Sequence, residues 1–260
     1  MNAADPRDFD DKAQARQWAW DALQQQGAAR FPFPPHGRIP NFAGAAAAAH
    51  RLFDEAPWRN ATAIKVNPDA PQRYVREEAL ARGIRVYVPT PKLQGGFHLL
   101  DPDRIPAERF GAAATLASMA DWSREVALED LPALDAIVTG CAAVTLTGKR
   151  AGKGAGYSDL EFAILRELGF DAVPVATTVH DLQIVGDFPI EANDIPLTLV
   201  CTPTRSVRVE QPLPAPGGID WSRLAAEDLE AMPLLLALRR LQERRQRRPE
   251  VRPQGDAGRR

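Results

Sequence analysis

The chain has 260 residues, of which 45% are apolar and 25% are charged, a composition typical of one large globular domain or two small ones. A net charge of −2 excludes binding of nucleic acid through overall charge, and no run of residues is apolar enough to cross a membrane. Cys141 and Cys201 stand alone in apolar runs, which indicates buried small side chains rather than a disulfide or metal site. The first twelve residues are polar and unlike a signal peptide, so we expect a cytoplasmic protein.

Helices and short strands alternate along the first part of the chain. Residues 12–26 predict an amphipathic helix, which the proline-rich segment 31–35 ends, and alanine-rich residues 43–53 predict a second helix. A strand at 63–66, a helix at 71–82 and a strand at 84–88 are predicted next.

The second half continues this alternation. Further strands are predicted at 136–139, 142–146, 173–179 and 197–201, and a helix is predicted around 160–168. Apolar strands that alternate with helices favour a mostly parallel α/β sheet with both faces covered. Ligands bind such sheets at the carboxyl ends of the strands, where Asn67, Thr90 and the segments 152–157 and 178–183 are expected.

The C-terminal segment is apolar at 234–241 and then rich in arginine, and we expect disorder beyond residue 247. We interpret residues 1–235 as a single α/β domain and residues 236–260 as an arginine-rich helix end and tail. The arginines are compatible with RNA or acidic partners, or with a solvated helix end. The second interpretation is favoured, because no aromatic residues alternate with the arginines as in single-strand binders.

The most distinctive stretch is the glycine-rich segment 148–159, which reads GKRAGKGAGYSD between a predicted strand and a predicted helix. Glycines let the backbone N–H groups approach a ligand closely, and a following helix adds positive charge at its N-terminus, as in phosphate-binding loops. The spacing matches neither the P-loop nor the G-x-G-x-x-G dinucleotide motif. A tight turn that uses glycine only for its backbone freedom is the alternative to an anion site.

This segment and a second block together carry a resemblance to a known family. The second block is TVHDLQIV at 178–185, followed by Pro189, Glu191, NDIP at 193–196 and VCTPT at 200–204. Their order and separation resemble the 5-formyltetrahydrofolate cyclo-ligase family, also called the methenyltetrahydrofolate synthetase family, and most closely its methenyltetrahydrofolate synthase domain-containing branch. The resemblance extends from about residue 12 to residue 208.

The resemblance implies a three-layer α/β sandwich with a mostly parallel central sheet, of the NagB/RpiA/CoA-transferase-like and Rossmann-like type. It also implies an enzyme dependent on ATP and Mg²⁺ that converts 5-formyltetrahydrofolate to 5,10-methenyltetrahydrofolate. In that reaction the formyl oxygen attacks the γ-phosphate, N10 closes the ring and phosphate leaves. Such phosphoryl transfer depends on positioning and on neutralisation of charge more than on covalent catalysis.

The resemblance also implies roles for individual residues. Arg150 and Tyr157 correspond to catalytic residues, and Asp159 and Asp194 to residues that hold Mg²⁺. Nucleotide binding is implied for Lys12, Arg16, Gly152, Lys153, Gly154, Ala155, Gly156 and Tyr157. Two alternatives stay open: Lys12 and Arg16 as the solvated face of a helix, and Asp159 as a first-turn acid that favours the helix dipole.

Several positions depart from the family pattern. Ser158 replaces a tyrosine, and Leu160 and Glu161 stand where a basic residue is usual; the family's glutamate near the folate site has no clear counterpart. Nucleotide binding is therefore better supported by the sequence than folate binding. The alternatives to an enzyme are a non-catalytic nucleotide- or folate-binding protein on the same fold and an RNA-associated protein that uses its basic tail.

Overall fold

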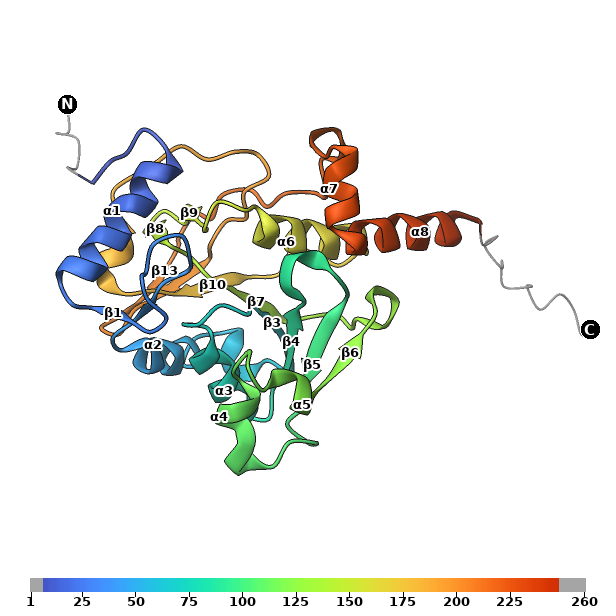
Figure 1. The fold of residues 1–260 in the computed structure, drawn as a ribbon, viewed down its shortest axis with the longest axis horizontal. Coiled ribbons are helices and arrows are strands. Elements are labelled where there is room, and N and C mark those ends of the chain that lie inside the picture. Colours follow the sequence, from blue (N-terminus) through green and yellow to red (C-terminus); the bar gives the residue numbers. More distant parts are fainter. Residues whose placement is uncertain (1–6, 248–260) are drawn as a thin grey trace, which may run out of the picture.

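The computed structural model describes residues 7–247, which build an eight-stranded sheet between two layers of helices (Figure 1). The strand order is β13-β12-β10-β7-β3-β4-β5-β6. The five strands from β12 to β4 are parallel to one another, and the remaining pairings are antiparallel. The strands are β3 (Ala63–Val66), β4 (Arg85–Pro89), β5 (Phe97–Leu100), β6 (Ser123–Val126), β7 (Ala136–Thr139), β10 (Val175–Thr178), β12 (Leu199–Cys201) and β13 (Ser206–Arg208). The predicted three-layer α/β sandwich with a mostly parallel central sheet is confirmed.

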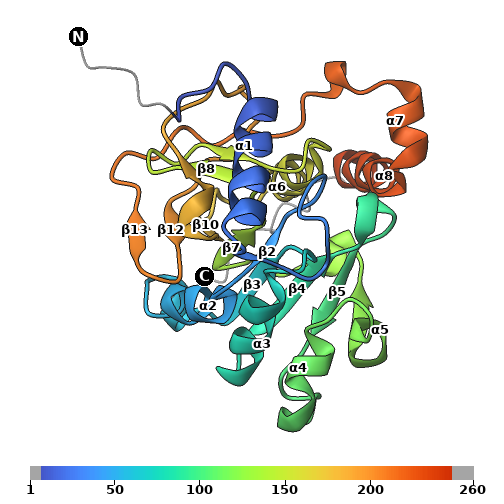
Figure 2. The same ribbon diagram turned by 60° about the vertical axis from the view of Figure 1, so that its left-hand side comes forward.

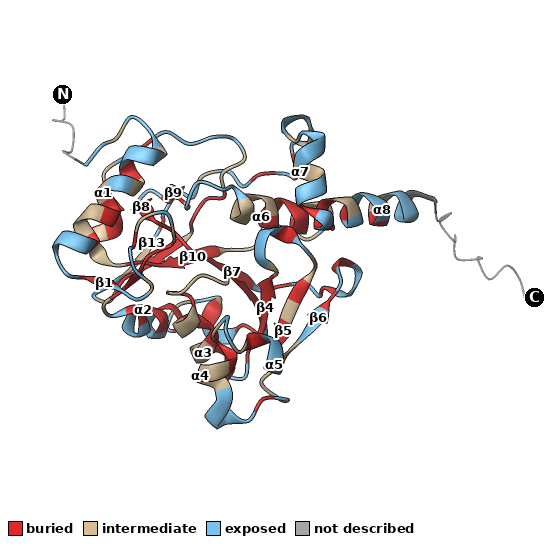
Figure 3. Ribbon diagram, viewed as in Figure 1, coloured by how far each residue is buried: buried red, intermediate tan, exposed pale blue. Residues whose placement is uncertain are grey.

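Helices cover both faces of this sheet, so its central strands are buried (Figure 3). One face is covered by α2 (Ala45–Leu52), α3 (Arg73–Ala81), α4 (Phe110–Ala113) and α5 (Met119–Trp122). The other is covered by α6 (Tyr157–Glu167), α7 (Ala226–Ala231) and α8 (Pro233–Arg247). None of the helices within residues 7–247 has both the length and the apolar character needed to span a bilayer.

The alternation of side chains along β3 directs one charged residue into the second layer. Ile64 and Val66 pack in the core beneath α2 and α3. Lys65, between them, points to the opposite face because successive side chains of a strand alternate, and it lies beneath α6. A buried cation therefore stands under the helix that follows the glycine loop.

A smaller sheet places the first helix beside this region. Strands β8 (Ala143–Thr145), β9 (Arg150–Ala151) and β11 (Ile184–Val185) form it, while β1 (Ala29–Arg30) pairs separately with β2 (Asn41–Phe42). Helix α1 (Lys12–Gln25) lies across the small sheet, as Figure 2 shows, and packs on it through Ala15 and Ala19. Because both alanines are small, α1 lies close to β8 and β9. Short 3₁₀ helices occur at Trp58–Asn60, Pro91–Leu93, Ala107–Arg109, Leu128–Asp130, Asp181–Gln183 and Trp221–Arg223.

The predicted elements of the central sheet agree with the structure to within two residues at each end, but β5, β6, β13, α4 and α5 were not predicted. Helices α4 and α5 have four residues each, too few to show a helical period. Strand β6 is a short edge strand in which three of the four residues are polar, so it lacks an apolar alternation. Cys141 and Cys201 are buried and free, as expected.

The C-terminal helix α8 runs across the predicted boundary at residue 235. Its Leu238 and Leu241 are buried in the core cluster with α6. Arg239 lies over the ring of Trp221, 4.4 Å from its centre, so this arginine packs on the protein itself. Residues 248–260 of the predicted arginine-rich tail lie outside the described residues, and the division into two segments stays a prediction.

Candidate functional site

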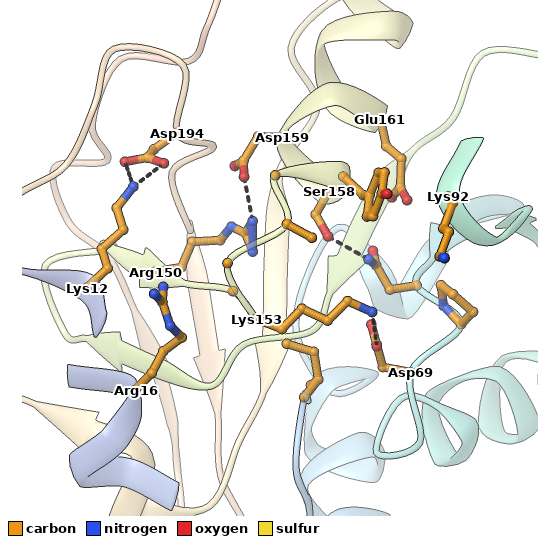
Figure 4. A pocket seen from close by; sticks show the side chains of 18 of the residues that line it. Lys12, Arg16, Asp69, Lys92, Arg150, Lys153, Ser158, Asp159, Glu161 and Asp194 are labelled. Carbon is orange, nitrogen blue, oxygen red and sulfur yellow. Dashed lines mark hydrogen bonds and ion pairs between the residues drawn. The ribbon is translucent and has the colours of Figure 1, made fainter. Parts of the chain in front are cut away.

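A cavity of about 880 Å³ opens where the predicted loops meet (Figure 4). Its walls come from the start of α1, the glycine loop, the first turns of α6, and the segment 189–194. The loops that follow β3 and β4 close the opposite side, through Asn67, Asp69, Thr90 and Lys92. The expectation that these loops share one site at the carboxyl ends of the strands is borne out for all but the segment 178–183.

The glycine loop requires glycine at two positions. Gly154 has φ +100° and Gly156 has φ +69°, values that side chains rarely adopt. Gly156 is the N-cap of α6, and no side chain among residues 7–247 caps the helix, so within this range its first N–H groups are without a side-chain partner beside the cavity. A helix N-terminus in this state favours an anion.

Two arginines pack directly against this loop. A Cβ atom on Gly152 would lie 3.3 Å from Nη1 of Arg150, and one on Gly154 would lie 3.6 Å from Nη2 of Arg16. A side chain at Gly152 would therefore crowd the Arg150 guanidinium, and one at Gly154 would be in contact with that of Arg16. Because these glycines have no Cβ atoms, the backbone N–H groups of the loop and the two guanidinium groups lie close together.

Every residue to which the sequence assigned a role lines this cavity. The set comprises Lys12, Arg16, Arg150, Gly152, Lys153, Gly154, Ala155, Gly156, Tyr157, Asp159 and Asp194. Their roles stay predictions, but the fold brings α1, β9, the glycine loop, α6 and the segment 189–194 together as the resemblance implied. Lys12 and Arg16 are on the wall of a cavity rather than on a freely solvated helix face.

Most of the cations in this set are paired with carboxylates. Lys12 Nζ lies 2.5 Å from Asp194, Arg150 Nη2 lies 3.0 Å from Asp159, and Lys153 Nζ lies 3.6 Å from Asp69 Oδ1. No ion pair of Arg16 is found among residues 7–247. Burial lowers the pKa of Arg16, with Asp11 opposing this effect. Arg16 is therefore a cation that a ligand reaches without displacing a carboxylate.

Arg150 is the most deeply buried of these cations, with 4% of its side chain exposed. Burial has the largest single effect and lowers the pKa of its guanidinium, but Asp159, Cys141 and Asp194 together outweigh burial and raise the pKa above its usual value. Nη1 donates to the carbonyl of Gly140, 3.3 Å away, at the end of β7. Arg150 is thus a permanent positive charge fixed between the sheet and the glycine loop.

The two aspartates predicted to hold a metal ion, Asp159 and Asp194, each accept hydrogen bonds from a basic side chain and from a backbone N–H group. Asp159 accepts hydrogen bonds from Arg150 and from the backbone N–H of Ile195, at 3.0 and 3.1 Å. Asp194 accepts from Lys12 and from the N–H of Glu191. No group of three or more His, Cys, Asp or Glu side chains in the described part of the chain is arranged to hold a metal by itself. A metal ion at this site therefore requires oxygen atoms from a ligand as well.

A buried polar network that the sequence did not predict forms the far end of the cavity. Lys65 on β3 makes an ion pair with Glu161 of α6, and both side chains are more than nine-tenths buried. Lys65 Nζ also donates to Asn67 Oδ1, and Asn67 Nδ2 donates to Ser158 Oγ; the donor–acceptor distance is 2.8 Å in both hydrogen bonds. The sequence did contain one signal of this network: Lys65 stands within an otherwise apolar strand, and a lysine that is buried there requires a polar or acidic partner.

Arg76 fixes the loop that carries part of this network. Its guanidinium is buried and donates to the backbone carbonyl of Asn67. It also donates to the backbone carbonyl of Ala114, at a distance of 2.8 Å. Burial lowers the pKa of Arg76 to about 9, while Asp69 opposes this shift. Arg76 therefore holds the ends of two cavity-lining segments, the turn after β3 and the stretch that leads to Leu116.

The second block of the sequence mainly supports the site from behind. Gln183 accepts from the N–H of His180 and donates to the carbonyls of Cys141 and Ala142. Asp181 accepts from the hydroxyl groups of Thr202 and Thr204. These residues do not line the cavity, so their polar groups satisfy the backbone and one another.

The buried pair of Arg150 and Asp159 leads to a stability prediction. We expect Asp159→Asn to lower the free energy of unfolding by about 3 kcal/mol or more, because Arg150 then keeps its charge in a buried place without a carboxylate. Glu77→Gln removes the half-exposed partner of Arg73 on α3 and is the matched control, with an expected loss below about 1 kcal/mol. Urea denaturation of the three proteins measures both changes. Similar small losses for the two variants would contradict the structural importance of the Arg150–Asp159 pair.

Comparison with known proteins agrees with this arrangement. The model of the 5-formyltetrahydrofolate cyclo-ligase family matches residues 10–203. Methenyltetrahydrofolate synthase domain-containing proteins of Bos taurus and Homo sapiens are 37% and 34% identical to the chain, over 92% and 88% of its length. The chain spans 64% and 61% of the length of these two relatives.

Solved structures of similar proteins are more distant. The 5,10-methenyltetrahydrofolate synthetase of Aquifex aeolicus has a TM-score of 0.48 at 16% identity, covering 77% of this chain and 93% of its own. The synthetase of Mycoplasma pneumoniae has a TM-score of 0.43 at 14% identity, covering 77% of this chain and 99% of its own. The family match, which takes in the glycine loop, α6 and the second block, shows that the chain belongs to the 5-formyltetrahydrofolate cyclo-ligase family.

Proposed function

We propose that this protein is an ATP-dependent enzyme that converts 5-formyltetrahydrofolate to 5,10-methenyltetrahydrofolate, or carries out a related ATP-dependent reaction on a similar substrate. The observation that carries the proposal is the uncapped N-terminus of α6, which continues the glycine loop beside the cavity among Lys12, Arg16, Arg150 and Lys153. Membership of the cyclo-ligase family supports the same reaction.

The proposal assigns the phosphate groups of ATP to the glycine loop. The N–H groups of residues 152–157 donate to phosphate oxygens, while Arg16 and Arg150 neutralise their charge from the side of α1 and β9. Lys12 and Lys153 have long, flexible side chains, and in this proposal they leave Asp194 and Asp69 to bind phosphate oxygens when ATP is bound. Tyr157, the first residue of α6, lines the same cavity.

The charge of the cavity supports a role for Mg²⁺. Five basic and six acidic side chains line the cavity, so its walls do not by themselves neutralise a triphosphate. Mg²⁺ is bound by one or two carboxylates together with phosphate oxygens, which suits Asp159 and Asp194 better than a site built from protein atoms alone. When bound, the ion supplies charge neutralisation for the phosphate groups.

A second candidate is a nucleotide- or folate-binding protein without turnover. The observation that favours it is the engagement of Ser158 and Glu161 in the network with Asn67 and Lys65, at positions where the family pattern has a tyrosine and a cation. Within the described part of the C-terminal helix, Arg239 packs on Trp221 and Arg245 donates to the carbonyl of Leu168, so these two arginines do not favour RNA binding.

Binding and turnover experiments separate these functions. We expect MgATP and 5-formyltetrahydrofolate each to raise the melting temperature, because ligands that bind only the folded state stabilise it. We also expect ATP-dependent formation of methenyltetrahydrofolate, followed by its near-ultraviolet absorbance, at less than about 1 s⁻¹, since the site lacks one cation and one tyrosine. Binding without turnover would establish the second candidate, and absence of binding would contradict both.

A pair of glycine variants tests the phosphate-binding loop. Gly154→Val places a side chain against Arg16 at a positive φ, and we expect MgATP affinity to fall by at least about 10-fold, equivalent to about 1.4 kcal/mol. Gly169→Val introduces the same backbone strain at φ +91°, just after the end of α6 and away from the cavity. Calorimetry should show wild-type ATP affinity for the Gly169 variant. Equal affinity in both variants would show that the loop does not bind phosphate.

Titrations with and without Mg²⁺ test the aspartates. We expect Mg²⁺ to tighten binding of ATP to the wild-type protein by about 10-fold or more. A residue that holds the ion should lose most of this enhancement on substitution, so Asp159→Asn and Asp194→Asn are compared with the wild type by calorimetry. A variant in which affinity falls equally with and without Mg²⁺ assigns its aspartate to positioning Arg150 or Lys12 instead.

A further inference from the structure

Glu161 presents an open carboxylate oxygen at the end of the cavity away from α1. Its side chain is 6% exposed, and one of its oxygens, Oε2, pairs with Lys65. Among residues 7–247 no hydrogen bond to the other oxygen, Oε1, is found, although Glu161 lines the cavity. Oε1 is thus an accessible acceptor on a cavity-lining residue, and a ligand group that supplies an N–H or O–H donor makes a charge-assisted hydrogen bond with it.

The adjoining Ser158 adds a second polar group. Its hydroxyl oxygen accepts a hydrogen bond from Asn67 Nδ2, and no acceptor for its own O–H is found in the described part of the chain. Glu161, Lys65, Asn67 and Ser158 thus form a continuous network with an acceptor at one end and a donor at the other, both from residues that line the cavity. In the view of Figure 4, the Glu161 side chain descends from α6 between Ser158 and Lys92.

The chemistry of this end differs from that of the glycine loop. The carboxylate of Glu161 repels phosphate and accepts N–H groups, whereas the glycine loop and its arginines favour an anion. A ligand group that donates N–H to the carboxylate stabilises its charged form. Pro68, Pro91 and Leu116 also line the cavity and offer apolar surface to a flat ring.

The geometry of α6 sets where such a ring would lie. Glu161 follows Tyr157 by four residues, so both side chains project from the same face of the helix, one turn and about 5.4 Å apart. A ring held at Glu161 therefore lies next to the phosphate end rather than remote from it. This placement suits the reacting end of a substrate or the base of a nucleotide.

We propose that Glu161 Oε1 and the Ser158 hydroxyl form a subsite for an amino-substituted nitrogen heterocycle, with the carboxylate accepting N–H and the hydroxyl donating to a ring nitrogen or oxygen. The subsite rests on the proposed function, which offers two sources of this chemistry: the pterin ring of a reduced folate and the adenine of ATP. Leu160 and Glu161 stand where the family pattern has a basic residue after the loop aspartate, so an acidic group takes part at this end of the cavity.

A charge-neutral double variant tests the subsite without leaving a buried charge. Lys65→Met with Glu161→Leu removes both members of the ion pair and replaces them with apolar side chains of similar size, a change that proteins tolerate better than loss of one member. Glu161→Gln is the second variant, and circular dichroism establishes that each is folded. The probes, all titrated by calorimetry, are inorganic tripolyphosphate with Mg²⁺, MgATP, 5-formyltetrahydrofolate and the analogue of the last with methyl in place of the 2-amino group.

We expect the double variant to keep wild-type affinity for tripolyphosphate and to lose about 10- to 100-fold in affinity for the ligand whose ring occupies the subsite. Loss confined to 5-formyltetrahydrofolate identifies the pterin, and loss confined to MgATP identifies adenine. For the pterin, the wild type should prefer the amino compound to its methyl analogue, and the double variant should not.

Two results would overturn the subsite while the proposed function stands. One is unchanged affinity of the double variant for both MgATP and 5-formyltetrahydrofolate. The other is an equal loss for tripolyphosphate, which would place the effect of Glu161 at the phosphate end. Failure of the wild type to bind any of the probes would contradict the proposed function itself.

Discussion

The attachment of helix α6 to the small sheet and to the central sheet, by two ion pairs with buried cations, is the constraint on which the site depends. Asp159 and Glu161, two residues apart on the helix, pair with Arg150 of β9 and Lys65 of β3. Residues two apart project in different directions from a helix, so the pairs hold its first turns from two sides. A buried ion pair contributes little net stability compared with apolar packing, but it penalises any arrangement that separates the charges. The N-terminus of α6 is thereby fixed in direction beside the cavity.

The same two pairs divide the cavity chemically. On the side of β9 the helix N-terminus, Arg150 and Arg16 create an electropositive end that suits phosphate. On the side of β3 the carboxylate of Glu161 reaches the cavity and suits donors instead. The loop after β4 completes this second side with Lys92, whose φ of +55° is unusual for a residue with a side chain. The neighbouring Leu93 shares this conformation and is fully buried, so packing maintains the strained loop.

The parallel core of the fold and the glycine loop on the wall of the cavity were predictable because both leave local signals. Apolar strands such as residues 63–66 and 136–139 and the glycines of the loop are visible in short stretches of sequence. The partners that complete the site were not predictable in this way. Lys65 and Glu161 are 96 residues apart, and only the packing of α6 over β3 brings them together. The edge strand β6 was missed because three of its four residues are polar, so only its pairing with β5 identifies it as a strand.

The ion pairs between lysines and aspartates on the cavity walls affect how a negatively charged ligand enters. Lys12 and Lys153 are partly exposed and hold Asp194 and Asp69 from opposite walls, which keeps two long side chains ordered and aimed across the cavity. A phosphate group that takes the place of either aspartate finds the lysine already positioned, so little further side-chain entropy is lost. The displaced carboxylate then lies next to the negatively charged phosphates, and a cation between the carboxylate and the phosphates stabilises both. The cavity walls do not supply this cation, because they carry no more basic than acidic side chains. A nucleotide that arrives with its own divalent ion satisfies both requirements together. Arg16, which makes no ion pair among residues 7–247, gives the incoming phosphates a first contact, with Asp11 as the carboxylate that acts on its charge.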